Sequence, residues 1–202
     1  ATLPDKSRLG EQVLVAISDD GGKTWPGHSI VFDDPDKKLG FFEQKLVEIS
    51  PGRVLATAWT VTLADVRDKP NSYCISDDDG STWGPIKSTG IEGQTLTPVA
   101  LDDDRLLVLF NRRYGRQAIV MALVSFDNER WTVHHEGLLY DPQSTRSRED
   151  DQSDGLAELD SFAFGFPTAI SLHDDTLLAT FWSKEHGVCG IHWAKLRVDW
   201  LV

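Results

Sequence analysis

Apolar and polar positions along this chain repeat in units that predict β-hairpins. Three segments align with one another without a gap: residues 47–59 (VEISPGRVLATAW), 99–111 (VALDDDRLLVLFN) and 170–182 (ISLHDDTLLATFW). Each contains a short apolar run, a tight turn of the Pro-Gly or Asp-Asp type, and a second run rich in apolar residues. Such turn residues accept unusual backbone angles and hydrogen-bond their own amides. Each segment therefore predicts two antiparallel strands joined by a short turn.

The spacing of these hairpins predicts the architecture. They begin at residues 47, 99 and 170, so successive starts are 52 and 71 residues apart. A period near 40 to 50 residues is typical of β-propellers, in which each repeat forms one blade. The longer second interval is explained by a polar, charged stretch at 143–159, which we interpret as an inserted surface loop. No long helical periodicity competes, so the sequence predicts an all-β fold.

A second repeat lies out of phase with the hairpins. Residues 18–25 (SDDGGKTW) match residues 76–83 (SDDDGSTW), and a degenerate third copy at 125–131 (SFDNERW) lacks the glycine. The two full copies share Ser18, Asp20, Gly22 and Trp25 in the first, and Ser76, Asp78, Gly80 and Trp83 in the second. In such a turn the aspartate can accept backbone amides, the glycine can take a positive φ and the tryptophan can cover the turn. We therefore interpret these aspartates as structural, not catalytic.

The pattern Ser-x-Asp-x-Gly-x-Thr-Trp resembles the Asp box, or BNR repeat, of the sialidase (neuraminidase) superfamily. This resemblance implies a sialidase-like β-propeller of the six-bladed type, of which the chain would cover about the C-terminal half. We expect a single propeller segment over 1–202, with an outer half-blade at 8–34 and blades at about 40–90, 94–141 and 160–202. These make about three and a half blades. A missing N-terminal half or a second copy, as a homodimer, would close the ring, because an open stack leaves sheet edges and faces uncovered.

Composition excludes several classes of partner. The formal net charge of −12 argues against nucleic acid, which needs an excess of Lys and Arg, and against an anionic membrane surface. No apolar run approaches the ~20 residues of a membrane helix. Cys74 and Cys189 lie in apolar stretches and are expected to be buried free thiols, although a disulfide stays open, as does the compartment. We expect no metal and no cofactor, because His134 and His135 would point to opposite faces of a strand and no phosphate loop or serine-hydrolase arrangement occurs.

Candidate site residues gather in the loops expected at the end of the propeller opposite the Asp boxes. The segment 111–116 (NRRYGR) supplies three guanidinium groups and a phenol. Clustered arginines suit a carboxylate, and a tyrosine nucleophile needs a carboxylate to take its proton. The resemblance implies an arginine triad, a Tyr nucleophile assisted by Glu, an Asp acid/base and a retaining mechanism. The predicted catalytic residues are Glu43, Tyr114 and Asp160, and the predicted substrate-binding residues are Arg112, Arg113, Arg116, Trp59, Trp182 and Glu185.

Each of these assignments has a plainer alternative. The arginines would pair with the acidic surface, the two tryptophans would pack between blades, and the carboxylates would pair with Arg112 or Arg113. Three functions stay open: a glycoside hydrolase or relative acting on an acidic or neutral sugar, a non-catalytic carbohydrate-binding propeller, and a structural or protein-interaction propeller. The fold alone does not choose among them.

Overall fold

The computed structural model describes residues 10–102, 104–127, 130–147, 162–172 and 176–197, and this part of the chain contains strands and no helix. The first sheet pairs β1 (Gln12–Ile17) with β2 (Gly27–Asp33). The second has the order β3 (Leu39–Ser50), β4 (Arg53–Thr62), β5 (Asp68–Ser76) and β6 (Lys87–Ser88). The third contains β7 (Gln94–Ala100), β8 (Arg105–Arg112), β10 (Ala118–Phe126) and β11 (Trp131–Tyr140). The fourth contains β13 (Phe164–Ser171), β14 (Thr176–Glu185) and β15 (Val188–Arg197), and a small ribbon pairs β9 (Gly115–Arg116) with β12 (Thr145–Arg146).

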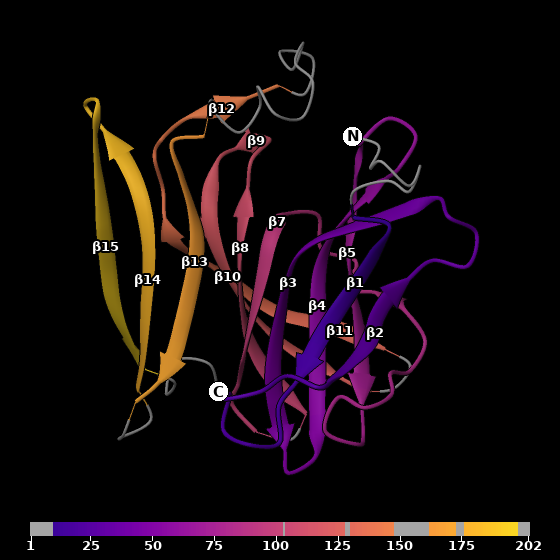
Figure 1. Ribbon diagram of the computed structural model, residues 1–202. Helices are drawn as coiled ribbons and strands as arrows, with labels where there is room; N and C mark the ends of the chain where they lie inside the picture. Colours follow the sequence, from indigo (N-terminus) through magenta and orange to yellow (C-terminus); the bar gives the residue numbers. More distant parts are fainter. Residues whose placement is uncertain (1–9, 103, 128–129, 148–161, 173–175, 198–202) are drawn as a thin grey trace.

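All strand pairs are antiparallel, and the three predicted hairpins occur at equivalent registers. Val47 faces Leu55 in β3–β4, Val99 faces Leu107 in β7–β8, and Ile170 faces Leu178 in β13–β14. The turn of the third hairpin, at 173–175, lies outside the described residues. The first strands of these sheets, β3, β7 and β13, are called the leading strands below. They lie side by side, with β7 in contact with both of the others (Figure 1).

The four larger sheets stack face to face in chain order (Figure 1). Strand β8 is buried on both faces. Its Val108 and Phe110 join a core with the β3–β6 sheet, whereas Leu107 and Leu109 join a core with the β13–β15 sheet. A third core packs the β1–β2 sheet on the β3–β6 sheet through side chains such as Phe32. Because successive apolar side chains of β8 point to opposite faces and both faces are buried, the sequence of β8 contains a continuous apolar run.

The two cysteines differ in environment. Both are free; Cys74 is buried and Cys189 is exposed. Burial raises the pKa of the Cys74 thiol to about 12. The expectation that Cys189 is buried is therefore wrong, because it lies on β15, which pairs only with β14 in its sheet and exposes much of one face. The apolar residues around Cys189 belong to a half-exposed strand, and the sequence pattern does not distinguish this from burial.

The turns at 18–25 and 76–83 have the same hydrogen bonds. Gly22 donates its N–H to Ser18 Oγ over 2.8 Å, and Gly80 donates to Ser76 Oγ over 2.8 Å. The carboxylate of Asp20 accepts both the N–H and the hydroxyl of Thr24, at 2.9 and 2.7 Å. These bonds connect residues at most four positions apart, so each turn is stabilised by its own sequence.

The two tryptophans of these turns differ in burial. Each indole lies close to the glycine of its own turn, which takes a positive φ. Trp83 also donates its indole N–H to Ser29 Oγ on β2 over 3.0 Å, and it packs against the core of the first two sheets. Trp25 stays 60% exposed. The second turn is therefore integrated into the stack of sheets.

The first turn predicts an acid-dependent loss of stability. Hydrogen bonds from the Thr24 hydroxyl and amide and from Ser18 lower the pKa of Asp20 from 3.8 to about 2. A carboxyl whose pKa is lower in the folded state stabilises the fold above its unfolded pKa, and this contribution is lost as the pH falls from about 4 through about 2. Asp20→Asn is expected to lower the melting temperature by a few degrees at pH 5 and by less at pH 2.5. Thermal unfolding across this range checks it, with Asp19→Asn as the control; equal pH profiles for Asp20→Asn and the unaltered chain would contradict it.

Candidate functional site

The three leading strands share one irregularity near their starts. Pairing with the second strand shifts between Phe42 and Lys45 in β3, between Gln94 and Thr97 in β7, and between Gly165 and Thr168 in β13. The first residue inside each shift has a left-handed backbone: Glu43 (φ 50°), Thr95 (φ 58°) and Phe166 (φ 48°). We call these three the bulge residues. A left-handed conformation is uncommon for residues other than glycine and strained for threonine, and such strain is typical of ligand-binding and catalytic sites.

Glu43 is held at the contact between the first two leading strands. The hydroxyl of Thr95, a buried residue, donates a hydrogen bond to the half-buried Glu43 carboxylate. Threonines also fix the bulges themselves, since Thr57 donates to the carbonyl of Leu96 and Thr97 to the carbonyl of Pro167, each over 2.7 Å. The carboxylate at Glu43 is therefore positioned by two adjacent sheets.

One position before each bulge, a residue on the leading strand faces one on the second strand. These cross-strand pairs are Phe42 with Trp59, Gln94 with Asn111, and Gly165 with Trp182. The sequence alignment had already placed Trp59, Asn111 and Trp182 at equivalent positions. Gln94 Nε2 and Asn111 Oδ1 are buried without a hydrogen-bond partner among the residues that the structure describes. The middle pair is therefore polar and only partly satisfied.

Both tryptophans predicted as sugar platforms contact neighbouring side chains. The Trp59 ring lies 5.6 Å from the Phe42 ring, between centroids, and its indole N–H donates to Asp68 Oδ1 over 2.8 Å. Trp182 lies over Gly165, where an added Cβ would approach the indole Nε1 to 3.1 Å. Both indoles are half-buried. These contacts lie within single sheets, so packing of the tryptophans between blades and their role toward sugar both stay predictions.

Arg113 is only 4% exposed and joins the third sheet to the fourth. Its Nε donates to Gln94 Oε1 over 3.0 Å, and its Nη1 donates to the carbonyl of Phe164. The guanidinium also lies 3.8 Å from the centroid of the Phe162 ring, which is a cation–π geometry. Arg113 thus has an evident structural role, and binding of substrate by Arg113 remains a prediction.

Arg112 and Arg116 lie together at the end of β8. Arg112 Nε donates to the carbonyl of Arg116 over 2.8 Å, and Arg116 Nη2 lies 2.5 Å from Asp141 Oδ2. The hydrogen bond from Arg116 is the main cause of a lowered pKa at Asp141. This ion pair corresponds to the plainer expectation for the arginines, that they pair with acidic groups.

Pairing of β9 with β12 brings a residue to this cluster that the sequence did not indicate. Arg146 faces Gly115 in the ribbon, and its guanidinium lies 6.0 Å from the centroid of the Tyr114 ring. No sequence signal links residues 115 and 146, because they come together only through a two-residue ribbon. The surroundings of Tyr114 are therefore basic on this side.

The remaining predicted residues lie elsewhere or outside the described part. Glu185 accepts a hydrogen bond from the Tyr140 hydroxyl over 3.0 Å at the end of β14. Asp160 lies outside the described residues. Within the described ranges, no group of three or more His, Cys, Asp or Glu side chains could hold a metal ion. No helix among these residues is long and apolar enough to cross a membrane.

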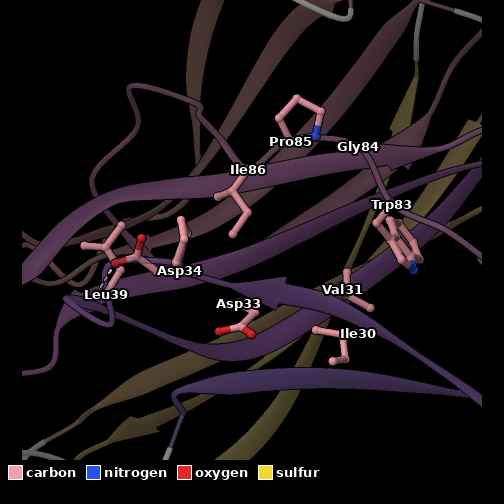
Figure 2. A pocket seen from close by; sticks show the side chains of 10 residues that line it. Ile30, Val31, Asp33, Asp34, Leu39, Trp83, Gly84, Pro85 and Ile86 are labelled. Atoms are coloured by element: carbon pink, nitrogen blue, oxygen red, sulfur yellow. Dashed lines mark hydrogen bonds between the residues drawn. The ribbon is translucent and has the colours of Figure 1, made fainter.

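A cavity of about 510 Å³ lies away from the bulge residues, between β2 and the segment that follows β5 (Figure 2). Its walls are largely apolar and include Ile30, Trp83 and Ile86. Both acidic residues that line the cavity already have partners. Asp33 forms an ion pair with Lys37, and the Asp34 carboxylate accepts hydrogen bonds from the backbone N–H groups of Lys38 and Leu39. We therefore place the candidate site at the bulge residues and not in this cavity.

The fold of this chain is similar to that of two solved structures. A protein of unknown function from Dyadobacter fermentans matches 90% of this chain and 44% of its own, at 24% identity and a TM-score of 0.66. The Hadza microbial sialidase Hz136 matches 92% of this chain and 39% of its own, at 13% identity and a TM-score of 0.59. The chain thus spans under half the length of either structure. No protein-family model matches the chain, and no curated protein matches it.

These likenesses establish the fold at a coarse level. The chain is all-β, is built from antiparallel sheets and is similar to the propeller fold of a sialidase. At these identities the likeness does not extend to activity.

Proposed function

We propose that this chain forms part of a glycoside-hydrolase-type β-propeller and that Glu43 is the central carboxylate of its sugar site. The observation that carries the proposal is the strained backbone of Glu43, whose carboxylate Thr95 fixes from the adjacent leading strand. A carboxylate held in this way can accept a sugar hydroxyl or exchange a proton with a reacting group. The fold likeness to a sialidase supports a sugar as the ligand.

The chemistry that we propose is the retaining hydrolysis of a glycoside. Tyr114 would attack the anomeric carbon while Glu43 takes its phenolic proton, and Asp160 would protonate the leaving oxygen. Water would then attack the anomeric carbon while Asp160 takes its proton, and the departing Tyr114 oxygen would regain its proton from Glu43. Arg112 and Arg116 would orient the substrate beside Tyr114, and Arg113 would serve mainly to hold the third and fourth sheets together.

A non-catalytic carbohydrate-binding propeller is the second candidate. It is favoured by the pairing of Phe42 with Trp59, whose indole Asp68 fixes in one orientation. Rigid aromatic surfaces suit stacking on the apolar face of a sugar. This candidate shares the sugar ligand but requires no proton transfer.

We further propose that the sheets belong to a six-bladed ring, with about three and a half blades in this chain. The outer face of the β13–β15 sheet exposes Ile170, Ile191 and Trp193, at 58%, 78% and 71%. Large apolar side chains exposed in this way mark a contact surface. Further blades of a longer protein or a second copy of the chain would cover it, and the mass of the species in solution distinguishes the two.

A panel of aryl glycosides of neutral and acidic sugars tests the proposed function. We expect at least one member to be hydrolysed and its product sugar to change the tryptophan fluorescence. Binding without release of the aryl group would favour the second candidate. Neither binding nor hydrolysis across the panel would contradict both, and would favour the structural or protein-interaction function.

A further inference from the structure

Phe166 is exposed at a position where folding alone does not favour an aromatic residue. Its side chain is 53% exposed, so about half of its apolar surface stays in contact with water and does not stabilise the fold. Its backbone is also left-handed, with φ 48°. A glycine would adopt this backbone more easily, and a polar residue would be better solvated. Both features are expected of an aromatic residue that contacts a ligand.

The backbone on both sides of Phe166 is fixed. An added Cβ at Gly165 would lie 2.8 Å from Arg113 Nη2, so the strand passes close against this buried guanidinium. On the other side, the carbonyl of Pro167 accepts the hydroxyl of Thr97 from β7 over 2.7 Å. The ring is thus carried by an anchored segment and not by a loose loop.

Phe166 lies in line with the proposed sugar site. It is the bulge residue of β13, as Thr95 is of β7 and Glu43 of β3, and β7 contacts both neighbouring strands. Thr95 already donates its hydroxyl to Glu43. The row therefore places an aromatic ring and a carboxylate on the two strands that flank β7, and the buried Thr95 of β7 positions the carboxylate.

An aromatic ring together with a carboxylate matches the chemistry of a pyranose. A pyranose has an apolar C–H face that stacks on aromatic rings, and its hydroxyls donate to a carboxylate. We infer that Phe166 is the stacking platform of a pyranose subsite that it shares with Glu43, whose carboxylate Thr95 positions. This inference rests on the proposed sugar function and adds a residue and a ligand geometry at the bulge residues, apart from the Phe42–Trp59 surface.

The test is calorimetric titration of the 202-residue chain with the methyl pyranosides of glucose, galactose and mannose. Phe166→Ala is expected to weaken the best of these by about tenfold, equal to ~1.4 kcal/mol. Phe166→Tyr keeps the ring and is expected to stay within about threefold of the unaltered chain. Trp25→Ala removes an exposed aromatic from the turn at 18–25 and is the control, with no change expected. Thermal unfolding of each variant verifies that it is folded.

The outcomes separate this inference from the function on which it rests. Unchanged affinity in Phe166→Ala, together with lost affinity in Glu43→Gln, would overturn the stacking role and leave the sugar function standing. Equal losses in Phe166→Ala and Phe166→Tyr would also overturn it, because the ring would then not be the recognised feature. No binding of any pyranoside by the unaltered chain would overturn the subsite, and the aryl glycoside panel would show separately whether the sugar function survives.

Discussion

Glu43→Gln is expected to reduce the rate of glycoside hydrolysis by about 10²- to 10⁴-fold, the usual contribution of a group that transfers a proton. The amide keeps the size of the carboxylate and an oxygen that can accept the Thr95 hydroxyl, so the bulge of β3 should persist. It cannot take a proton from Tyr114 or carry the negative charge. The loss should therefore fall on kcat more than on KM, in a glycoside that the unaltered chain hydrolyses.

The matched control for this variant is Glu48→Gln. Glu48 lies on the same strand and is exposed, and it faces Val54 beside the turn of the hairpin. Its substitution should leave the rate within about twofold, because surface changes away from a site are usually small. Equal rates for Glu43→Gln and Glu48→Gln would remove Glu43 from the mechanism. A loss of binding alone, in a chain without hydrolysis, would support the non-catalytic candidate.

Arg113→Met is expected to lower the free energy of unfolding by about 3 kcal/mol, because it leaves two buried acceptors without their donor. These acceptors are Gln94 Oε1 and the carbonyl oxygen of Phe164. The variant also removes the cation–π contact with Phe162. The methionine fills much of the same volume, so the change reports mainly on the lost polar contacts. Urea unfolding measures it.

Arg67→Met is the control, because that side chain is 78% exposed and its ion pair with Asp65 is expected to contribute at most ~1 kcal/mol. Arg113→Lys keeps the charge but not the planar fork, so an intermediate loss is expected. If Arg113 instead acts chiefly as a sugar ligand, Arg113→Met would lose binding with an unchanged unfolding midpoint. That result would contradict the structural role.

Features that depend on neighbours in the chain could be predicted from the sequence. The three hairpins followed from turn residues between apolar runs, and they occur at the same register. The turn at 18–25 could also be predicted from the sequence, since its hydrogen bonds join residues at most four positions apart. Glu43 was a predicted catalytic residue in the loops expected opposite the Asp boxes, and in the structure it lies near the start of β3.

Features that depend on contacts between sheets could not be predicted in this way. The left-handed backbone at Glu43, Thr95 and Phe166 arises where strand pairing shifts, and no turn residue marks it. The sequence predicted Arg113 as one member of an arginine cluster. In the structure it is buried against the strand that contains Phe164, 51 residues away in the chain.

The sequence by itself therefore determined the all-β character, the hairpins and the local turns, because short-range hydrogen bonds and the alternation of apolar residues specify them. Only the tertiary structure decided which side chains meet. It placed Thr95 on Glu43, Arg116 on Asp141 and Arg146 beside Tyr114. The physical reason is that these contacts depend on how separate strands pack, and residues far apart in the chain carry no local pattern that records it.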